Sequence, residues 1–384
     1  MVDAFPDEEE EAGAVGDGVG LALSGGGYRA MVFHVGSLWR LNEVGLLPKI
    51  RRVSSVSGGS ITAAALALAW PDLKFERGVA RQFSLFVDQI RKMSSTNVDV
   101  GAVIGGILLP GSISDRVSDA YDDVLFQGKT LQDLPDEVLG RAPRFVFNAT
   151  NVQTAALWRF SKPYMGDHRV GLFERPDTPI SRVVAASSAF PPILSPMTLE
   201  LAGPVVPTKG ADLSRAPFTQ SAFLSDGGVY DNLGLETLKT FKTILVSDAG
   251  QKIAPEEEPE SDWARHSVRI LDVVDNQVRS LRKRQLIRDY ETKSRDGAYW
   301  GIRTDWENYK LVDDPLRCRD RDPSALARTP TRLQKMESDH FEKLVNWGYA
   351  VCDAALRAHV DNALQLKLGV EIDRPGSFPY PIGY

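Results

Sequence analysis

The residues best suited to chemistry in this chain stand in three short glycine-rich turns. In the first of these turns, Ser57 lies between a short apolar run and the glycines Gly58 and Gly59. A serine on a sharp turn between a strand and a helix is exposed at the sheet's edge, and small neighbours let a substrate come close. The pattern departs from G-x-S-x-G by one residue, because Ser55 takes the first glycine position. Taken alone, the segment also fits a turn that merely opens a helix.

A second turn carries three consecutive glycines, Gly25, Gly26 and Gly27, after another apolar run. Consecutive glycines expose backbone N–H groups, which is the geometry of an anion-binding nest. In acyl transfer, the bound anion would be the oxygen of the tetrahedral intermediate. The segment from Gly25 to Ala30 also satisfies the dinucleotide pattern G-x-G-x-x-A. That alternative needs an acidic residue at the end of the next strand, where this chain has no carboxylate.

The third turn begins with Asp226, which is followed by Gly227 and Gly228. Two glycines after a strand-end carboxylate leave it open to a neighbouring group, although Asp-Gly turns are also common without any catalytic role. A free carboxylate has a pKa of about 4 and is a weak base for a serine. Partial burial at a strand end would raise that pKa toward the working pH.

The elements that must position these turns form a strand–turn–helix pattern that occurs twice. Apolar runs at residues 19–23 and 53–56 each lead into a glycine turn, and helix-type patterns begin at Tyr28 and Ile61. Two such units in a row predict a parallel sheet with a ligand site at the carboxyl ends of its strands. We also predict paired strands at residues 144–148 and 156–160, strands at 223–225 and 243–247, helices at 268–290 and 332–360, and surface loops at 201–221 and 251–262.

The composition is that of a soluble globular protein, with 384 residues, 43% hydrophobic, 25% charged and a net charge of −6. This balance gives no basis for nucleic acid as a partner. The two cysteines, Cys318 and Cys352, are far apart, which argues against a disulfide framework or a zinc site and fits a reducing compartment. Residues 1–18 are acidic and lack the basic start and apolar core of a secretory signal. We therefore expect a disordered tail at residues 1–18, a single domain at 19–384 with a helical extension from about residue 263, and a cytoplasmic location.

Three motifs in this order resemble the patatin-like phospholipases: SGGGYRA at residues 24–30, SVSGG at 55–59 and DGG at 226–228. The glycine segment is similar to that of the cytosolic phospholipase relatives of this family. Residues 144–161 and 185–191 also match segments of the family, whereas nothing beyond about residue 250 does. The resemblance implies a three-layer α/β/α sandwich with a mostly parallel central sheet.

The same resemblance implies a catalytic dyad of Ser57 as nucleophile and Asp226 as base, with Gly58 and Gly59 supporting the serine's turn. The oxyanion hole would come from Gly25, Gly26 and Gly27 together with Arg29. For Arg29 the residues leave two interpretations open: support of the oxyanion or of a lipid phosphate, and an ion pair that fixes the loop.

The predicted activity is release of fatty acids from glycerophospholipids or lysophospholipids through an acyl-enzyme, with no metal and no cofactor. The alternatives are a general esterase or acyltransferase, and a non-catalytic lipid- or nucleotide-binding module. A triad using His266 would keep the order Ser, Asp, His. None of the chain's five histidines stands in a glycine-rich turn at a strand end, which favours the dyad.

Two segments bear on contact with a membrane. Residues 98–110 are apolar and glycine-rich but shorter than the roughly 18 residues that a membrane span needs, so they fit a mobile cap or core-packing chain. The helix predicted at 268–290 carries a basic group that fits anionic headgroups or a solvated face: Arg279, Arg282, Lys283, Arg284 and Arg288. We expect a phospholipid or lysophospholipid substrate and transient contact with a membrane surface.

Overall fold

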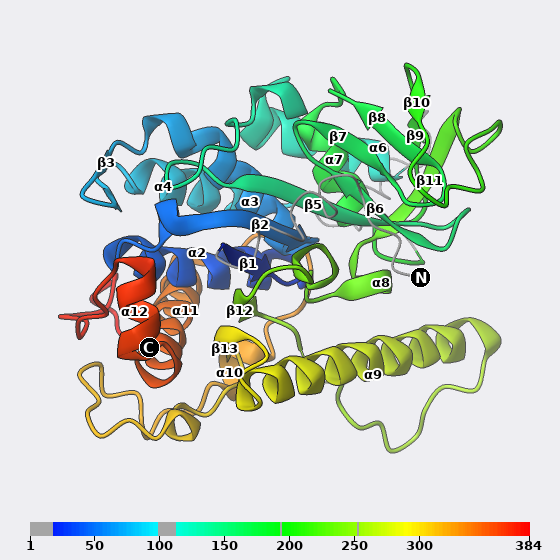
Figure 1. Ribbon diagram of the computed structural model, residues 1–384. Helices are drawn as coiled ribbons and strands as arrows, with labels where there is room; N and C mark the ends of the chain where they lie inside the picture. The colour runs from blue at the N-terminus through cyan, green and yellow to red at the C-terminus, as the bar shows by residue number, and fades with distance from the viewer. Residues whose placement is uncertain (1–17, 99–112, 193, 252) are drawn as a thin grey trace.

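The computed structural model describes residues 18–98, 113–192, 194–251 and 253–384, so the acidic tail and most of the apolar segment at 98–110 lie outside it. The chain forms a mixed α/β fold around a large central sheet (Figure 1). The strand order is β10-β8-β7-β6-β5-β2-β1-β12-β13, and β11 pairs with β5 and β9. The strands are β1 Val19–Leu23, β2 Ile50–Val56, β5 Arg144–Asn151, β6 Ala156–Phe160, β7 Tyr164–Asp167, β8 Gly171–Glu174, β9 Met197–Glu200, β10 Val205–Val206, β11 Ser221–Asp226, β12 Thr243–Asp248 and β13 Asp296–Gly301. A separate hairpin joins β3 Phe75–Glu76 to β4 Val79–Ala80.

The helices cover both faces of this sheet. They are α2 Gly27–Glu43, α3 Gly58–Ala69, α4 Ser84–Ser94, α6 Ile113–Tyr121, α7 Ile180–Ser187, α8 Gly228–Asp231, α9 Trp263–Glu291, α10 Ser324–Ala327, α11 Ser338–His359 and α12 Asn362–Leu368. Within the described residues, no helix is both long and apolar enough to cross a bilayer.

Neighbouring residues of β1 belong to two different cores, because successive side chains of a strand point to opposite faces. Leu21 and Leu23 pack in the large core, which also contains residues of α2, α3 and α11. Ala22 packs in a small core on the other face, with Leu286 of α9. The fold is therefore a three-layer sandwich, with its larger hydrophobic core on the α2–α11 side.

The catalytic candidates meet because two strands end against the same edge of β5. Strands β5, β2, β1, β12 and β13 are mutually parallel. The pairing of β2 with β5 ends where Val56 lies opposite Asn148. Strand β11 runs the other way and ends where Asp226 lies opposite Ala149. At this point β6 occupies the other edge of β5, so β2 and β11 meet end to end along the same edge. Ser57 directly follows β2, and Asp226 is the last residue of β11.

Helices α2 and α11 pack with their backbones in contact. A Cβ added at Gly36 of α2 would lie 1.9 Å from the carbonyl oxygen of Val345, and one at Gly348 of α11 would lie 2.0 Å from that of Phe33. Any side chain larger than hydrogen at either glycine would therefore force the helices apart.

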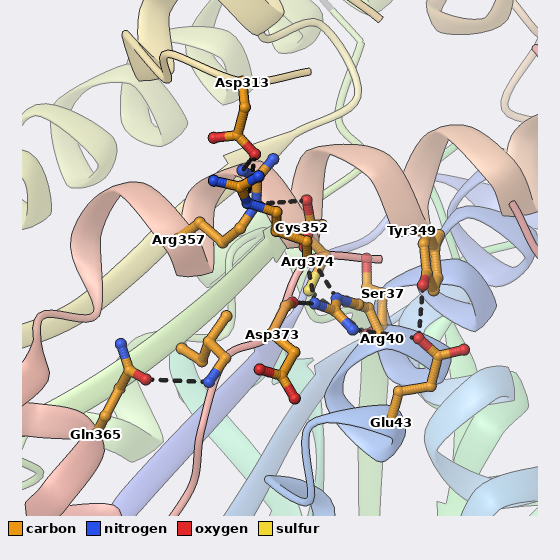
Figure 2. A network of polar contacts seen from close by, with 12 residues as sticks. Ser37, Arg40, Glu43, Asp313, Tyr349, Cys352, Arg357, Gln365, Asp373 and Arg374 are labelled. Atoms are coloured by element: carbon orange, nitrogen blue, oxygen red, sulfur yellow. Dashed lines mark hydrogen bonds and ion pairs between the residues drawn. The ribbon is translucent and has the colours of Figure 1, made fainter. Parts of the chain in front are cut away.

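An ion-pair network joins α2 and α11 near their C-terminal ends (Figure 2). Arg40 of α2 pairs with Asp353 of α11 at 2.9 Å, and Arg357 pairs with the other oxygen of Asp353 at 2.9 Å. The network continues to Glu43, which accepts a 2.5 Å hydrogen bond from Tyr349. The side chains of Arg40 and Asp353 are only 4% and 1% exposed, so the pair is buried as well as hydrogen-bonded.

The fold class predicted from the sequence is confirmed, and the strand β1 has the predicted bounds. The helix predicted at residues 332–360 is wrong at its start, since α11 begins at Ser338. The preceding residues are not helical because their backbone bonds to other segments: Val98 donates to Leu333 and Met336 donates to Ser94. The loop predicted at 201–221 contains the two-residue strand β10. The division into a tail and one domain stays a prediction.

Candidate active site

Ser57 stands at the tip of a sharp turn between β2 and α3. Its φ angle is +52°, a left-handed value that a residue with a side chain rarely adopts. The turn is held by a hydrogen bond from the Ser57 N–H to Ser187 Oγ at 3.0 Å. A Cβ at Gly58 would lie 2.1 Å from the carbonyl oxygen of Gly27, so only glycine fits directly after the serine.

The glycine turn between β1 and α2 lies against this serine. A Cβ on Gly25 would come within 3.2 Å of the Cβ of Ser57. Gly26 and Gly27 have φ angles of +139° and +58°, conformations that favour glycine. The Gly25 N–H donates to the carbonyl of Asn232 at 3.1 Å. Within the part of the chain that the structure describes, the N–H groups of Gly26 and Gly27 donate to no protein acceptor.

Asp226 is buried beside the serine. One of its carboxylate oxygens accepts a 2.7 Å hydrogen bond from the Gly228 N–H. Burial raises the pKa of Asp226 to about 7, against the smaller lowering effects of hydrogen bonds from Gly228 and Ser57. A carboxylate with this pKa is a much better proton acceptor near neutral pH than an exposed aspartate.

A cavity of about 720 Å³ brings these residues together. Its walls include the glycine turn, Ser57, Asp226 and the inner side of α9. The apolar part of the wall comes from Phe190, Pro191, Pro192, Leu194, Ile253, Ala254 and Leu333. The cavity volume falls within the range of small-molecule sites. Charged side chains of α9 line the cavity opposite the catalytic candidates: Arg269, Asp272, Asp275 and Arg279.

Ser187 connects the two catalytic candidates, and reasoning from the sequence missed it. Its Oγ accepts from the Ser57 N–H and donates to the carbonyl of Asn148 at 2.7 Å. Its own carbonyl accepts from the Gly227 N–H at 3.2 Å. Ser187 therefore holds the turn at Ser57 and the turn after Asp226 in place relative to one another. The signal that could have found it is its position in residues 185–191, which the sequence had matched to the family without a role.

Arg29 is fully buried and binds backbone carbonyls. Its Nε donates to Ala249 at 3.0 Å and its Nη1 to Thr329 at 2.6 Å. These bonds tie the glycine turn to the segments after β12 and before α11. Its Nη2 is buried without a partner among the described residues and lies 3.1 Å from the position of a Cβ on Gly26. The side chain fixes the loops through carbonyls and keeps one N–H group beside the nest.

Ser55, which takes the first glycine position of the G-x-S-x-G pattern, is accommodated within β2. Its hydroxyl donates to the carbonyl of Val146 at 3.3 Å and accepts from Ser60 at 3.0 Å. Ser55 is fully buried and does not line the cavity. The Ser55 side chain therefore packs within the sheet and does not crowd the turn at Ser57.

The five histidines, all within the described residues, lie outside the cavity that holds Ser57 and Asp226. His266 is exposed on α9, where its Nδ1 faces the carbonyl of Glu260 at 3.2 Å. His34 is fully buried; burial lowers its pKa to about 4, so it is neutral. Its Nε2 donates to the carbonyl of Ser24 at 2.9 Å, which steadies the start of the glycine turn.

Comparison with known proteins identifies the family of this chain. The sequence profile of the family described as patatin-like phospholipase matches residues 21–239, a segment that contains the elbow, the glycine turn and Asp226. The chain belongs to the patatin-like phospholipase family. No curated protein matches the sequence at a significant level.

Among solved structures, the patatin-like fold is similar to human GIVD cytosolic phospholipase A2, with a TM-score of 0.53, 15% identity and 92% of this chain covered. The same values hold for that protein in complex with methyl γ-linolenyl fluorophosphonate. The chain spans 60% of the length of these phospholipases. VipD from Legionella pneumophila matches with a TM-score of 0.37 and 14% identity, over 90% of this chain and 67% of VipD. At such identities, the human protein shows the fold alone.

Proposed function

We propose that this protein is a lipid acyl hydrolase that releases fatty acids from glycerophospholipids or lysophospholipids. The observation that carries the proposal is the strained Ser57, which shares a cavity with a buried Asp226 whose pKa is raised to about 7. Family membership supports a lipid ester as the substrate.

In the first half of the reaction, Asp226 accepts the proton of Ser57 Oγ while that oxygen attacks the ester carbonyl carbon. The tetrahedral intermediate then expels the alcohol part of the lipid, which takes the proton from Asp226, and the acyl group stays on Ser57. In the second half, Asp226 accepts a proton from water while the water oxygen attacks the acyl carbon of the acyl-enzyme. The bond from that carbon to Ser57 Oγ then breaks, Asp226 returns its proton to Ser57 Oγ, and the fatty acid leaves. No step needs a metal or a cofactor.

The negative oxygen of the intermediate lies at the glycine turn in this proposal. The N–H groups of Gly26 and Gly27 have no protein acceptor among the described residues, and Gly58 opens α3 directly after the serine. Gly25 contributes its lack of a side chain, since its N–H is already used by Asn232. Donors that need no rearrangement stabilise the developing charge more than the neutral carbonyl.

The lipid reaches this cavity from a membrane surface, and the outer face of α9 is suited to that contact. The exposed apolar residues of this helix are Trp263, Ile270, Leu271, Val273, Val274 and Leu281. Arg284 and Arg288 continue the exposed face toward the end of the helix. An apolar face with tryptophan and flanking arginines is typical of helices that bind anionic lipid interfaces. The opposite face of α9 lines the catalytic cavity. One helix therefore carries both the proposed membrane-contact face and a wall of the cavity that holds Ser57.

A fluorophosphonate probe tests the proposed function. The probe should label the wild-type protein on Ser57 alone, and Ser57→Ala should lose both labelling and ester hydrolysis while its circular dichroism spectrum is unchanged. Labelling that persists in Ser57→Ala, or that maps to Ser55 or Ser60, would reject Ser57 as the nucleophile.

A further inference from the structure

A second cavity, of about 340 Å³, adjoins the catalytic one. The two share Gly250, Asn276 and Arg279 in their walls. The second cavity lies between α9 and the ends of β12 and β13, and its other lining residues include Lys283 and Arg303. Its volume is within the range that small-molecule ligands occupy.

The charges around this second cavity do not balance. Arg279, Lys283 and Arg303 line it together with one carboxylate, Asp248. That carboxylate is already satisfied by Tyr299, whose hydroxyl donates at 2.6 Å, and by the Gly250 N–H at 2.8 Å. Among the described residues, no ion pair within 4.0 Å joins any of the three cations to an acidic side chain.

The cations are also partly desolvated. Arg279 is 8% exposed and donates to the carbonyl of Gln251, and the Lys283 ammonium lies 4.2 Å from the ring centre of Tyr299. Burial lowers the pKa of Arg303, and repulsion from Arg279 lowers it further. Burial likewise lowers the pKa of Lys283; attraction to Asp248 opposes this lowering, and repulsion from Arg303 and Arg279 adds a smaller part. Gathering like charges in a half-buried cavity costs free energy that a bound anion would recover.

We propose that this second cavity binds a ligand through a phosphate monoester group. The charged residues that line this cavity are three cations and Asp248, with a net charge of +2. Asp275 of the adjoining cavity interacts with Arg279 and offsets part of this charge. The remaining positive charge suits a phosphate monoester, which carries about −1.5 to −2 near pH 7. Ser280, Asn276 and Asn308 line the same cavity and supply neutral donors to the remaining oxygens. The group belongs either to the headgroup of a lipid whose ester lies at Ser57, or to a free phosphorylated molecule; only the first source rests on the proposed function.

The binding test uses Ser57→Ala protein, so that no turnover occurs, and titrates it with inorganic phosphate by calorimetry. We expect saturable binding that weakens at least about tenfold in Lys283→Gln/Arg303→Gln, since each lost ion contact is worth roughly a factor of ten. The matched control is Arg81→Gln/Lys129→Gln, which removes the same charge from exposed side chains outside both cavities and should bind phosphate as before. Absence of saturable binding, or equal affinity in the two double variants, overturns the proposal. Because calorimetry measures binding and needs no activity, this test of the phosphate site is valid even if Ser57 is not the nucleophile.

Kinetics with soluble short-chain lipids then distinguish the two sources. With Ser57 intact, Lys283→Gln/Arg303→Gln should raise KM for dihexanoyl phosphatidic acid and leave dihexanoyl phosphatidylcholine unchanged if the headgroup is the ligand. If the phosphate belongs to a free molecule, neither KM changes while phosphate binding is still lost, which equally supports the site. An equal rise in KM for both lipids would mean that the cations serve the catalytic cavity in general, and it would overturn a phosphate site.

Discussion

The two long helices of the protein, α11 and α9, are built in opposite ways. Helix α11 is buried along most of its length and touches the backbone of α2 at Gly348. In α9, the only buried side chains among those described are Arg279 and Leu286. The inner side of α9 borders two polar cavities, and its outer side exposes apolar residues.

This difference separates stability from function. Residues that fill a dense core contribute to the free energy of unfolding, whereas residues that border cavities and solvent contribute little to it and are available for ligands. Substitutions in α11 should therefore unfold the protein without changing its chemistry, and substitutions in α9 should do the reverse.

The largest effect on stability should come from Asp353→Ala in α11. The change leaves Arg40 and Arg357 as buried cations without their shared carboxylate, which typically costs about 3–5 kcal/mol. Urea denaturation should show this loss, while the fluorophosphonate labelling rate of the folded fraction stays at the wild-type value. A matched exposed ion pair offers the control, since Arg81→Ala, which removes the partner of Glu76, should change stability by less than about 1 kcal/mol.

Gly26→Ala should cost about 3 kcal/mol of transition-state stabilisation, because a side chain at φ +139° displaces one N–H donor. The loss should appear in kcat more than in KM. Titration with nicotinamide and flavin cofactors serves as the control for the dinucleotide alternative and should show no binding. Tight binding of such a cofactor, together with no hydrolysis of any acyl ester, would reject the hydrolase.

Asp226→Asn should stabilise the folded protein at pH 8. Asp226 has a folded pKa of about 7 against 3.8 when unfolded, so folding takes up a proton and the native state loses stability as the pH rises from 4 to 7. An asparagine avoids that penalty, and its oxygen can still accept from Gly228. Thermal melts should show a gain of about 4 kcal/mol at pH 8 that fades below pH 4, since the folded and unfolded pKa values differ by about 3. If the stability difference between Asp226→Asn and the wild type were the same at pH 8 and below pH 4, the pKa of Asp226 would not be raised in the folded protein.

Leu271→Ala on the outer face of α9 should change stability by less than about 0.5 kcal/mol, because the side chain is 51% exposed. Binding to anionic vesicles should weaken several-fold as apolar area is lost, in a co-sedimentation assay. Leu366→Ala, exposed on α12, is the control and should leave vesicle binding unchanged. Equal weakening in both variants would argue against α9 as the contact face.

The parts of the site that the sequence predicted are those that short motifs encode. Ser57, Asp226 and the glycine turn each carry their own local pattern, so their positions at strand ends followed without knowledge of the fold. Ser187 lies in a matched segment, but its role was missed because that role depends on contacts with Asn148 and Ser57 from other elements. The same holds for Arg29, whose charge suggested an anion partner although its bonds go to carbonyls more than 200 residues away.

The elements were predictable where periodicity was strong and missed where strands were short. Strand β13, Asp296–Gly301, contains two glycines and no long apolar run, so it escaped notice even though it closes one edge of the sheet. Strands β7 and β8 have four residues each, too few for alternation to stand out from chance.

The central claim, that Asp226 activates Ser57, is tested most directly by the pH dependence of fluorophosphonate labelling. In the wild type, the labelling rate at Ser57 should rise with pH through an apparent pKa of about 7, because the carboxylate must be ionised to accept the serine proton. In Asp226→Asn the rate at pH 8 should fall by at least about 10²-fold and the rise near pH 7 should disappear. A variant that keeps both the wild-type rate and the rise near pH 7 would contradict the dyad.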